Sequence, residues 1–323
     1  MTRWSKYLTL LAGLLLAGGA LAQSTKTVSL MVPYPAGGPS DAIARGFNMP
    51  LGQALGQQVI VENLGGATGA IAAQKVLSAP ADGRYLFQGS PNEAILAPLV
   101  NAAVKFKTED FRLVHPITNN DMVIVARKDF PANNVDELLA LARKSPDKPL
   151  SYGSVGVGSL YHLIVEDIQH RKGVKFTHVP YKGNAPLLQD MGGGSVDFAV
   201  LVYSAGMGAM VDEGRLKLLG QLSAKRSPQL QNVPSLAEGQ ELAGFDMHTW
   251  AGIMVPRSTP EAVVQHLHGA IQTALQDPQV RTAFEAQSGR VAAPMSQKEA
   301  DDYYVAETAR YRAIAKSINL QPQ

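Results

Sequence analysis

The stretch VPYPAGGPSDAIAR, residues 32–45, joins a short run of apolar residues to a stretch of helical character. The apolar residues have the composition of a strand, and residues 33–39 are rich in proline and glycine, which is typical of a turn. Ser40 or Asp41 is expected to cap the helix that follows, over residues 42–55. The stretch therefore predicts a strand, a loop and a helix in succession.

The same unit recurs along the chain. A strand at residues 58–62 precedes a helix at 70–78, and a strand at 150–154 precedes a helix at 160–170. Further strands are predicted at residues 85–89, 122–126, 176–180, 196–202 and 216–223, and helices at 135–144, 185–191, 260–275, 279–287 and 296–318. Alternation of this kind favours an α/β fold.

Two glycine-rich loops, at residues 36–38 and 153–158, each lie between a predicted strand and a helix. Because they are about 115 residues apart, we expect two α/β lobes that each present a loop and a helix N-terminus to a shared cleft. A helix N-terminus carries unpaired N–H groups and partial positive charge, and glycine lets a ligand approach the backbone closely. The pattern predicts an anionic ligand between the lobes.

Composition excludes several classes of protein. The chain has 323 residues, of which 46% are hydrophobic, enough for a substantial core and about two domains. With 29 Lys and Arg against 27 Asp and Glu, it lacks the basic excess of a nucleic-acid-binding surface. It has no cysteine, which excludes disulfides, thiolate nucleophiles and cysteine-ligated metals. We expect neither a nucleic-acid partner nor a metal or organic cofactor.

Residues 1–22 have the features of a secretory signal peptide. Arg3 and Lys6 precede an apolar stretch at residues 7–17, and the segment ends in Ala20-Leu21-Ala22, which suits signal peptidase. The alternative, a membrane anchor, needs about 20 apolar residues. The sequence therefore predicts cleavage and a free protein in the periplasm.

Four common catalytic or cofactor signatures are absent from the sequence. It contains no Gly-x-Ser-x-Gly elbow, dinucleotide-binding glycine motif, phosphate-binding loop or His-Glu-x-x-His helix. These absences favour a binding protein over an enzyme.

Several segments carry a resemblance to a known family. VPYPAGGPSDAIAR resembles the first-loop signature of the Bug family, the periplasmic solute-binding proteins of tripartite tricarboxylate transporters. Residues 61–73 (VENLGGATGAIAA), 152–163 (YGSVGVGSLYHL), 178–197 (HVPYKGNAPLLQDMGGGSVD) and 223–234 (SAKRSPQLQNVP) are similar to later segments of the same family. The resemblance covers nearly the whole chain after residue 22.

This resemblance implies a two-lobed, type II periplasmic-binding fold that closes on an organic carboxylate and delivers it to a membrane permease. Residues 24–121 and 249–323 would form lobe 1, and residues 122–248 lobe 2, with Met122–Val125 and Thr249–Val255 as the crossing strands. The family's ligand positions, carried over to this sequence, are Tyr34, Ala36, Gly37, Gly38, Ser40, Asp41, Ser90, Asn92, Ser154, Val155, Gly156, Ser159, His162, Tyr181, Lys182, Asn184, Ala185 and Tyr203. A monomer without cofactor or catalytic residue is expected.

Some alternatives stay open at this point. Leu64 stands where an arginine is common in the family, which puts an ion pair between the lobes in doubt. Residues 200–203 lack the acid that many members have near this strand end, which disfavours an amino-acid ligand. Tyr34, Tyr161 and Tyr203 favour an aromatic or apolar-chain carboxylate.

Trp250 is expected in the core, but whether Glu93, His162 and Trp250 touch the ligand is undecided. An enzyme of the same fold would need Glu93 and His162 as its acid and base. A ligand-sensing partner of a membrane signalling protein would share the same cleft.

Overall fold

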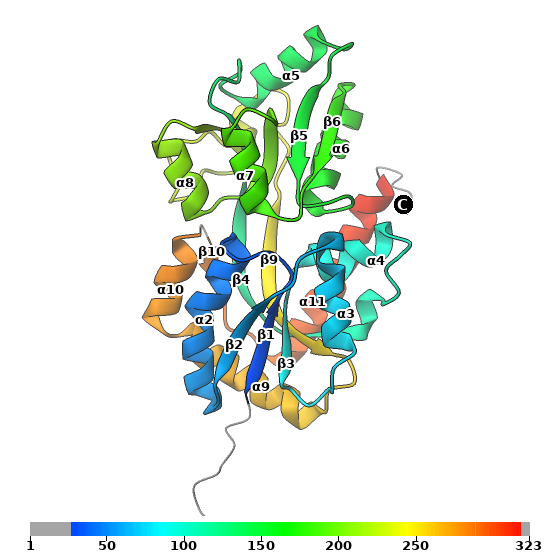
Figure 1. Ribbon diagram of the computed structural model, residues 1–323, viewed down its shortest axis with the longest axis vertical. Coiled ribbons are helices and arrows are strands. Elements are labelled where there is room, and N and C mark those ends of the chain that lie inside the picture. Colours follow the sequence, from blue (N-terminus) through cyan, green and yellow to red (C-terminus); the bar gives the residue numbers. More distant parts are fainter. Residues whose placement is uncertain (1–26, 288, 318–323) are drawn as a thin grey trace, which may run out of the picture.

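A computed structural model describes residues 27–287 and 289–317 and shows two lobes stacked along the long axis (Figure 1). The predicted signal peptide, residues 1–22, lies outside the described residues. Within the described ranges, no helix is both long and apolar enough to cross a membrane. The expected two-lobed α/β architecture is confirmed.

The first lobe is built around a mixed sheet. Strands β1 (Val28–Val32), β2 (Val59–Asn63) and β3 (Tyr85–Gly89) are parallel, and β9 (His248–Pro256) runs antiparallel to β3. Every residue of β1 is buried, as expected for a strand covered by helices on both faces. Helices α2 (Pro39–Leu55) and α3 (Ala70–Leu77) follow β1 and β2 and flank the sheet in Figure 1.

The second lobe repeats the alternation. Strands β5 (Leu150–Ser154), β6 (Phe176–Pro180) and β7 (Phe198–Val202) form its parallel part, and β8 (Leu216–Gln221) pairs with β4. The helices of this lobe are α5 (Val135–Lys144), α6 (Leu160–Lys172), α7 (Asn184–Gly192) and α8 (Ala205–Asp212).

Strand β4 (Phe111–Arg127) belongs to both sheets. Its first part pairs antiparallel with β9 as far as Asp121, and from Met122 onward it pairs with β7 and β8. The strand is interrupted by register shifts near His115 and Pro116, which lets it bend between the two sheets. Strands β4 and β9 therefore connect the two lobes (Figure 1).

The C-terminal part of the chain packs on the first lobe. Helices α9 (Glu261–Leu275) and α10 (Pro278–Glu285), the short strand β10 (Gly289–Val291) and helix α11 (Gln297–Ser317) follow β9. Arg112 of β4 joins two of these elements, because its guanidinium lies 2.5 Å from Glu261 Oε2 and 2.8 Å from Asp301 Oδ2. The described residues that follow β9 thus return to lobe 1, where β4 begins and β9 ends.

One local expectation needs correction, and two helical segments add to the predicted elements. Helix α2 begins at Pro39 with Gly38 as its N-cap, so neither Ser40 nor Asp41 caps it. Proline at the first helical position has the required φ and needs no N–H partner, which moves the helix start earlier. The segment after β3 is π-helical over Asn92–Leu96 and continues as the short α4 (Ala97–Val100). Helix α8 was not anticipated.

Candidate functional site

A cavity with a volume of about 50 Å³ lies between the two lobes. Loop and helix residues of lobe 1, residues of β4 and β9, and loop and helix residues of lobe 2 all contribute to its wall. The lining residues are Tyr34, Pro35, Gly38, Pro39, Ser40, Ile43, Ser90, Asn92, Asn120, Val155, Tyr161, Gly183, Asn184, Ala185, Val202, Thr249, Trp250 and Ala251.

Two helix N-termini reach this cavity from opposite lobes. Gly38 and Ser40 belong to the start of α2, and Gly183 and Asn184 to the start of α7. In both helices the N-cap is a glycine without a side-chain hydrogen bond, whereas the caps of α5 and α8 are closed by the side chains of an asparagine and a serine. The first N–H groups of α2 and α7 therefore have no capping side chain to compete with a bound anion.

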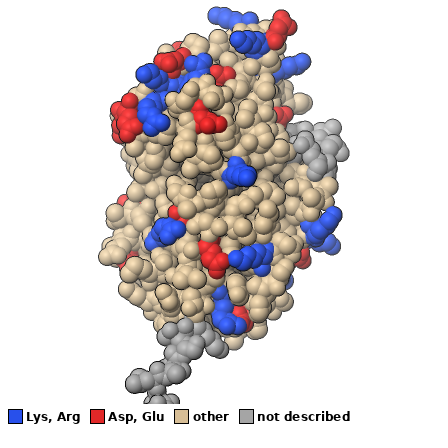
Figure 2. Space-filling view, in the orientation of Figure 1, with Lys and Arg blue, Asp and Glu red and all other residues tan. Residues whose placement is uncertain are grey.

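The described lining residues include no Lys, Arg, Asp or Glu. Their polar groups are hydroxyls and amides, such as those of Ser40, Ser90, Asn120 and Thr249. On the face shown in Figure 2, the boundary between the lobes is mostly uncharged, and charged side chains are spread over the outer parts of both lobes. Attraction for an anion must come from backbone dipoles and neutral donors.

Asn92 connects the two lobes at one side of the cavity. Its Oδ1 accepts a hydrogen bond from the Leu160 N–H of lobe 2 at 2.7 Å, and its Nδ2 donates to the Tyr34 hydroxyl at 3.2 Å. Asn92 is only 3% exposed, so water competes little for these bonds. Burial raises the pKa of Tyr34 and of Tyr161 beside it, so both phenols stay protonated hydrogen-bond donors.

The glycine-rich loop between β5 and α6 forms a second contact between the lobes. The Thr68 hydroxyl of lobe 1 donates to the Val157 carbonyl at 3.0 Å. A Cβ atom on Gly156 would lie 2.6 Å from Thr68 Oγ1, and one on Gly158 would overlap the side chain of Val100. The loop fits against lobe 1 only because glycine stands at these positions, so the structure represents a closed arrangement of the lobes.

Trp250 of β9 forms part of the cavity wall and is fully buried, in agreement with its expected place in the core. Its indole Nε1 donates to Glu307 Oε2 at 2.9 Å, and its ring packs edge-on against Tyr303 and Tyr304 of α11. Helix α11 therefore supports the cavity wall from behind.

Eight of the eighteen predicted ligand positions line the cavity. They are Tyr34, Gly38, Ser40, Ser90, Asn92, Val155, Asn184 and Ala185. They come from four separate loops that the topology brings together.

The structure does not bring the other ten to the cavity, and most of them have other partners. Asp41 is buried beneath the first loop, where it accepts hydrogen bonds from Arg45 Nε at 2.9 Å and the Gly37 N–H at 3.0 Å. Burial acts to raise the pKa of Asp41, but these hydrogen bonds lower it below its usual value. Ala36 and Gly37 are exposed. This part of the first loop is thus held by Asp41 from below and turned outward.

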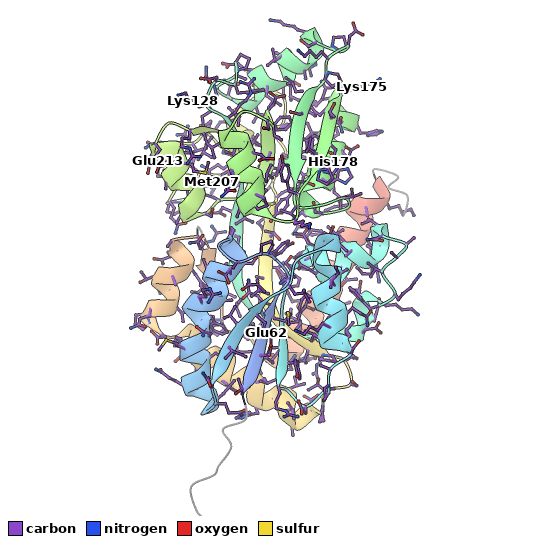
Figure 3. All side chains as sticks on the ribbon, viewed as in Figure 1. Glu62, Lys128, Lys175, His178, Met207 and Glu213 are labelled. Atoms are coloured by element: carbon purple, nitrogen blue, oxygen red, sulfur yellow. The ribbon has the colours of Figure 1, made fainter. Side chains whose placement is uncertain are left out.

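Ser154, Gly156, Ser159 and His162 build the second-lobe loop instead of facing the cavity. Ser159 is the N-cap of α6, and Ser154 Oγ lies 2.7 Å from His178 Nε2. His162 Nδ1 accepts the Gly158 N–H at 2.9 Å, and its ring stacks on His178, which Figure 3 labels, at a centroid distance of 4.2 Å. Burial lowers the pKa of both histidines to about 4, so they are neutral supports of the loop.

Tyr181, Lys182 and Tyr203 also lie outside the cavity. The Tyr181 hydroxyl donates to Asp190 Oδ2 at 2.8 Å, and Lys182 is exposed at the rim of lobe 2. Tyr203 packs against α8, where a Cβ on Gly208 would overlap its hydroxyl. Their side chains contact groups of their own lobe or solvent, and do not line the cavity.

Sequence reasoning missed part of the cavity. Asn120 and Thr249 lie where β4 and β9 cross between the lobes, and Ile43 and Val202 supply apolar contact. The glycine-rich signature gave no indication of these four positions. The predicted crossing of the chain near residues 121 and 249 was the signal that could have pointed to Asn120 and Thr249.

Comparisons with known proteins identify the family to which this chain belongs. The family model described as the tripartite tricarboxylate transporter family receptor matches residues 43–320. The chain belongs to this family. The predicted membership of the Bug proteins is thereby confirmed, and the family's receptors are periplasmic solute-binding proteins of tripartite tricarboxylate transporters.

Individual relatives agree. BugT of Bordetella pertussis is 30% identical over 278 residues, which cover 85% of this chain and 84% of BugT. The structure of Rhodopseudomonas palustris Rpa4515 with adipate has a TM-score of 0.86 at 29% identity and covers 93% of this chain and 100% of that one. MatC of the same organism, with bound malate, has a TM-score of 0.82 at 28% identity and covers 89% and 98% of the two chains. The expected periplasmic-binding fold is confirmed.

Proposed function

We propose that this protein is a periplasmic receptor that captures an organic carboxylate between its lobes and delivers it to a tripartite tricarboxylate-type permease. The observation that carries the proposal is the pair of glycine-capped helix N-termini, of α2 and α7, at one uncharged cavity. A carboxylate held by both would have its charge stabilised by two sets of N–H groups, without a buried lysine or arginine. Both lobes contribute, so ligand binding and closure are linked.

The cavity lining supports a carboxylate with a short carbon chain as the ligand. Ile43, Val155 and Val202 provide apolar contact for a short carbon chain. The lining has no acidic side chain to pair with an ammonium group, which argues against an amino acid. The relatives crystallised with adipate and malate are consistent with this class.

We further propose that the protein binds without catalysis. An enzyme of this fold would need an acid and a base facing the ligand. His162 does not line the cavity and uses its Nδ1 lone pair for the Gly158 N–H, so it is not available as the partner of Glu93. Among the described residues, no group of three or more His, Asp or Glu side chains is placed to hold a metal.

Further proposals concern the lobe boundaries of the protein, its oligomeric state and its location in the cell. We propose lobe boundaries at residues 24–121 with 249–323, and at 122–248, and the exchange of β4 from β9 to β7 near residue 121 supports them. We also propose that the mature protein acts as a monomer in the periplasm after removal of residues 1–22. Size-exclusion chromatography with light scattering and mass determination of the exported protein test these two points.

Thermal unfolding of the mature protein with a panel of carboxylates tests the proposed function. Malate, adipate, tricarboxylates, aromatic carboxylates and amino acids form the panel. A ligand at ~100 times its Kd stabilises the folded protein by about 2.7 kcal/mol, or roughly 4 °C in Tm for a chain of this length. Trp250 is the only tryptophan outside residues 1–22, so a change in its fluorescence on titration reports occupation of this cavity.

Gly38→Leu is expected to abolish the ligand-induced shift while leaving the fold intact. Gly38 has φ −87°, which any residue adopts, and the nearest atom to an added Cβ is 3.8 Å away, so a leucine fits the backbone but enters the cavity. Gly206→Leu is the matched control, because Gly206 is exposed on α8 and has no atom within 4 Å of an added Cβ. Unchanged affinity in the Gly38 variant would contradict the assignment of this cavity. A shift of Tm with amino acids, but with none of the carboxylates that lack an amino group, would contradict the proposed ligand class.

A further inference from the structure

A buried carboxyl group lies directly behind the cavity wall. Glu93, in the π-helical segment after β3, has no exposed surface. Its Oε2 accepts the Ser90 N–H at 2.7 Å, but its Oε1 has no hydrogen-bond partner. Among the ion pairs of the described residues, none includes Glu93. An ionised carboxylate in this position would be costly, because burial without a cation favours the neutral acid.

Among the described residues, no Lys or Arg is a cause of the pKa shift of Glu93. Burial raises its pKa above the ordinary value, and the titratable groups that face it are the phenols of Tyr34 and Tyr161. The loop at Gly69 covers it, since a Cβ there would overlap Glu93 Cγ.

Helix α11 packs on the same π-helical segment and places two tyrosines and a glutamate behind the cavity wall. Glu307 bonds Trp250, and the Tyr304 hydroxyl donates to the Thr108 carbonyl. Tyr303 contacts Trp250 edge-on. Arg310 of this helix pairs with Glu307 at 3.4 Å.

Tyr34 connects Glu93 to the cavity. The phenol lines the cavity, accepts a hydrogen bond from Asn92 Nδ2 and faces the Glu93 carboxyl closely enough for each to shift the pKa of the other. A phenol has a single proton to donate. If Glu93 is ionised, the Tyr34 hydroxyl donates its hydrogen bond to the carboxylate. The phenol oxygen can then only accept hydrogen bonds from the ligand. If Glu93 is protonated, it can donate to the Tyr34 oxygen, and the phenol proton is free to point into the cavity.

We propose that Glu93 is a positioning residue that is protonated when a carboxylate ligand binds, so that Tyr34 donates its hydroxyl hydrogen to the ligand. The proton comes from solvent and is held on Glu93 Oε1, the oxygen without a partner. This inference rests on the proposed function, because it requires an anionic ligand in the cavity. It adds that the receptor binds the carboxylate together with one proton.

Proton-linked binding predicts that affinity falls as pH rises. Where the free protein has Glu93 ionised and the complex has it protonated, the affinity decreases by up to ~10-fold per pH unit. Glu93→Gln replaces the acid with a neutral isostere that can also donate to Tyr34, so its Kd is expected to stay constant with pH and close to the wild-type value at low pH. Tyr34→Phe removes the donor and is expected to weaken binding roughly 10- to 100-fold.

Isothermal titration of the mature protein with malate and with adipate, from about pH 6 to about pH 9, tests the inference, since both carboxyls of each probe are mostly ionised in this range. The control is Glu213→Gln, an acid on the outer side of lobe 2 whose side chain is 60% exposed and which Figure 3 labels. It is expected to keep the wild-type pH slope. Titration in buffers of different ionisation enthalpy measures the proton uptake directly.

The outcomes separate the two proposals. A wild-type Kd that does not change with pH, or an equal slope in Glu93→Gln, overturns the role of Glu93 while leaving carboxylate binding in place. If the probes and the full carboxylate panel bind neither the wild type nor Glu93→Gln, both the role of Glu93 and the proposed function are overturned. A pH slope that disappears only in Glu93→Gln, with uptake of about one proton by the wild type, supports the inference.

Discussion

At the scale of single residues, Trp250 shows how the cavity wall is held. Its indole N–H and the Glu307 carboxylate are both buried and meet at 2.9 Å. Trp250→Phe removes that hydrogen bond and part of the ring, and is expected to lower the free energy of unfolding by about 2–4 kcal/mol. Chemical denaturation followed by circular dichroism measures this loss.

The control for this prediction is a double-mutant cycle. Glu307→Gln weakens the same bond from the other side, so the two substitutions together are expected to cost less than the sum of their separate effects. Strict additivity would show that Trp250 stabilises the protein through packing alone.

The residue scale is also where sequence reasoning reached its limit. Tyr34, Gly38 and Asn92 could be predicted, because they lie in loops with a recognisable pattern. Asp41 could not be assigned correctly, since whether a carboxylate faces a ligand or holds its own loop depends on the position of Arg45 and of the Gly37 N–H. The same holds for His162, whose partner His178 lies on another strand.

At the scale of elements, the loop from β5 to α6 decides whether the lobes can meet. Gly158 has φ +74°, and an added Cβ would overlap Val100 of lobe 1. Gly158→Ala is therefore expected to reduce ligand affinity by 10-fold or more, with a cost to the free protein of only about 1–2 kcal/mol from the positive φ. Calorimetric titration and thermal unfolding of the same variant separate these two effects.

A smaller side chain at residue 100 is expected to restore part of the affinity lost in Gly158→Ala. In the double variant Gly158→Ala, Val100→Ala, the overlap with the Val100 γ-carbons is removed, while a close contact of 2.8 Å with the Cβ of residue 100 and the backbone strain at residue 158 stay. Partial recovery of affinity is expected. If affinity does not recover at all, overlap with the Val100 γ-carbons is not what lowers the affinity of the single variant.

Most elements could be predicted from periodicity, but β4 only in part. Its second half, from Met122, is an apolar run, whereas its first half contains His115, Pro116 and Asn119, which are unusual in a buried strand. These residues are accommodated because β4 has register shifts and because β10 pairs with it at Asn119. That pairing joins segments about 170 residues apart, and no local pattern contains it.

At the scale of the whole molecule, the two crossing strands allow the lobes to move as bodies. Strands β4 and β9 connect them, and the contacts between the lobes include the hydrogen bonds of Asn92 and Thr68 and the close approach of Gly158 to Val100. Such an arrangement favours an equilibrium between open and closed forms that a ligand touching both lobes shifts toward the closed one. The alternation of strands and helices could predict two lobes, but not the position of this equilibrium, which depends on the balance of these contacts against solvent.

Small-angle X-ray scattering of the mature protein measures that shift. Addition of a carboxylate that binds is expected to reduce the radius of gyration of the wild type, because bringing the lobes together shortens the long axis of the molecule. Gly158→Ala at the same saturation is expected to show a smaller decrease, since the overlap with Val100 keeps the lobes apart. Gly206→Leu, which changes only the outer surface of α8, should behave like the wild type. A radius that does not change in the wild type, despite a measured Kd, would mean that the free protein is already closed, and ligand entry would then depend on rare opening of the contacts at Asn92 and Thr68.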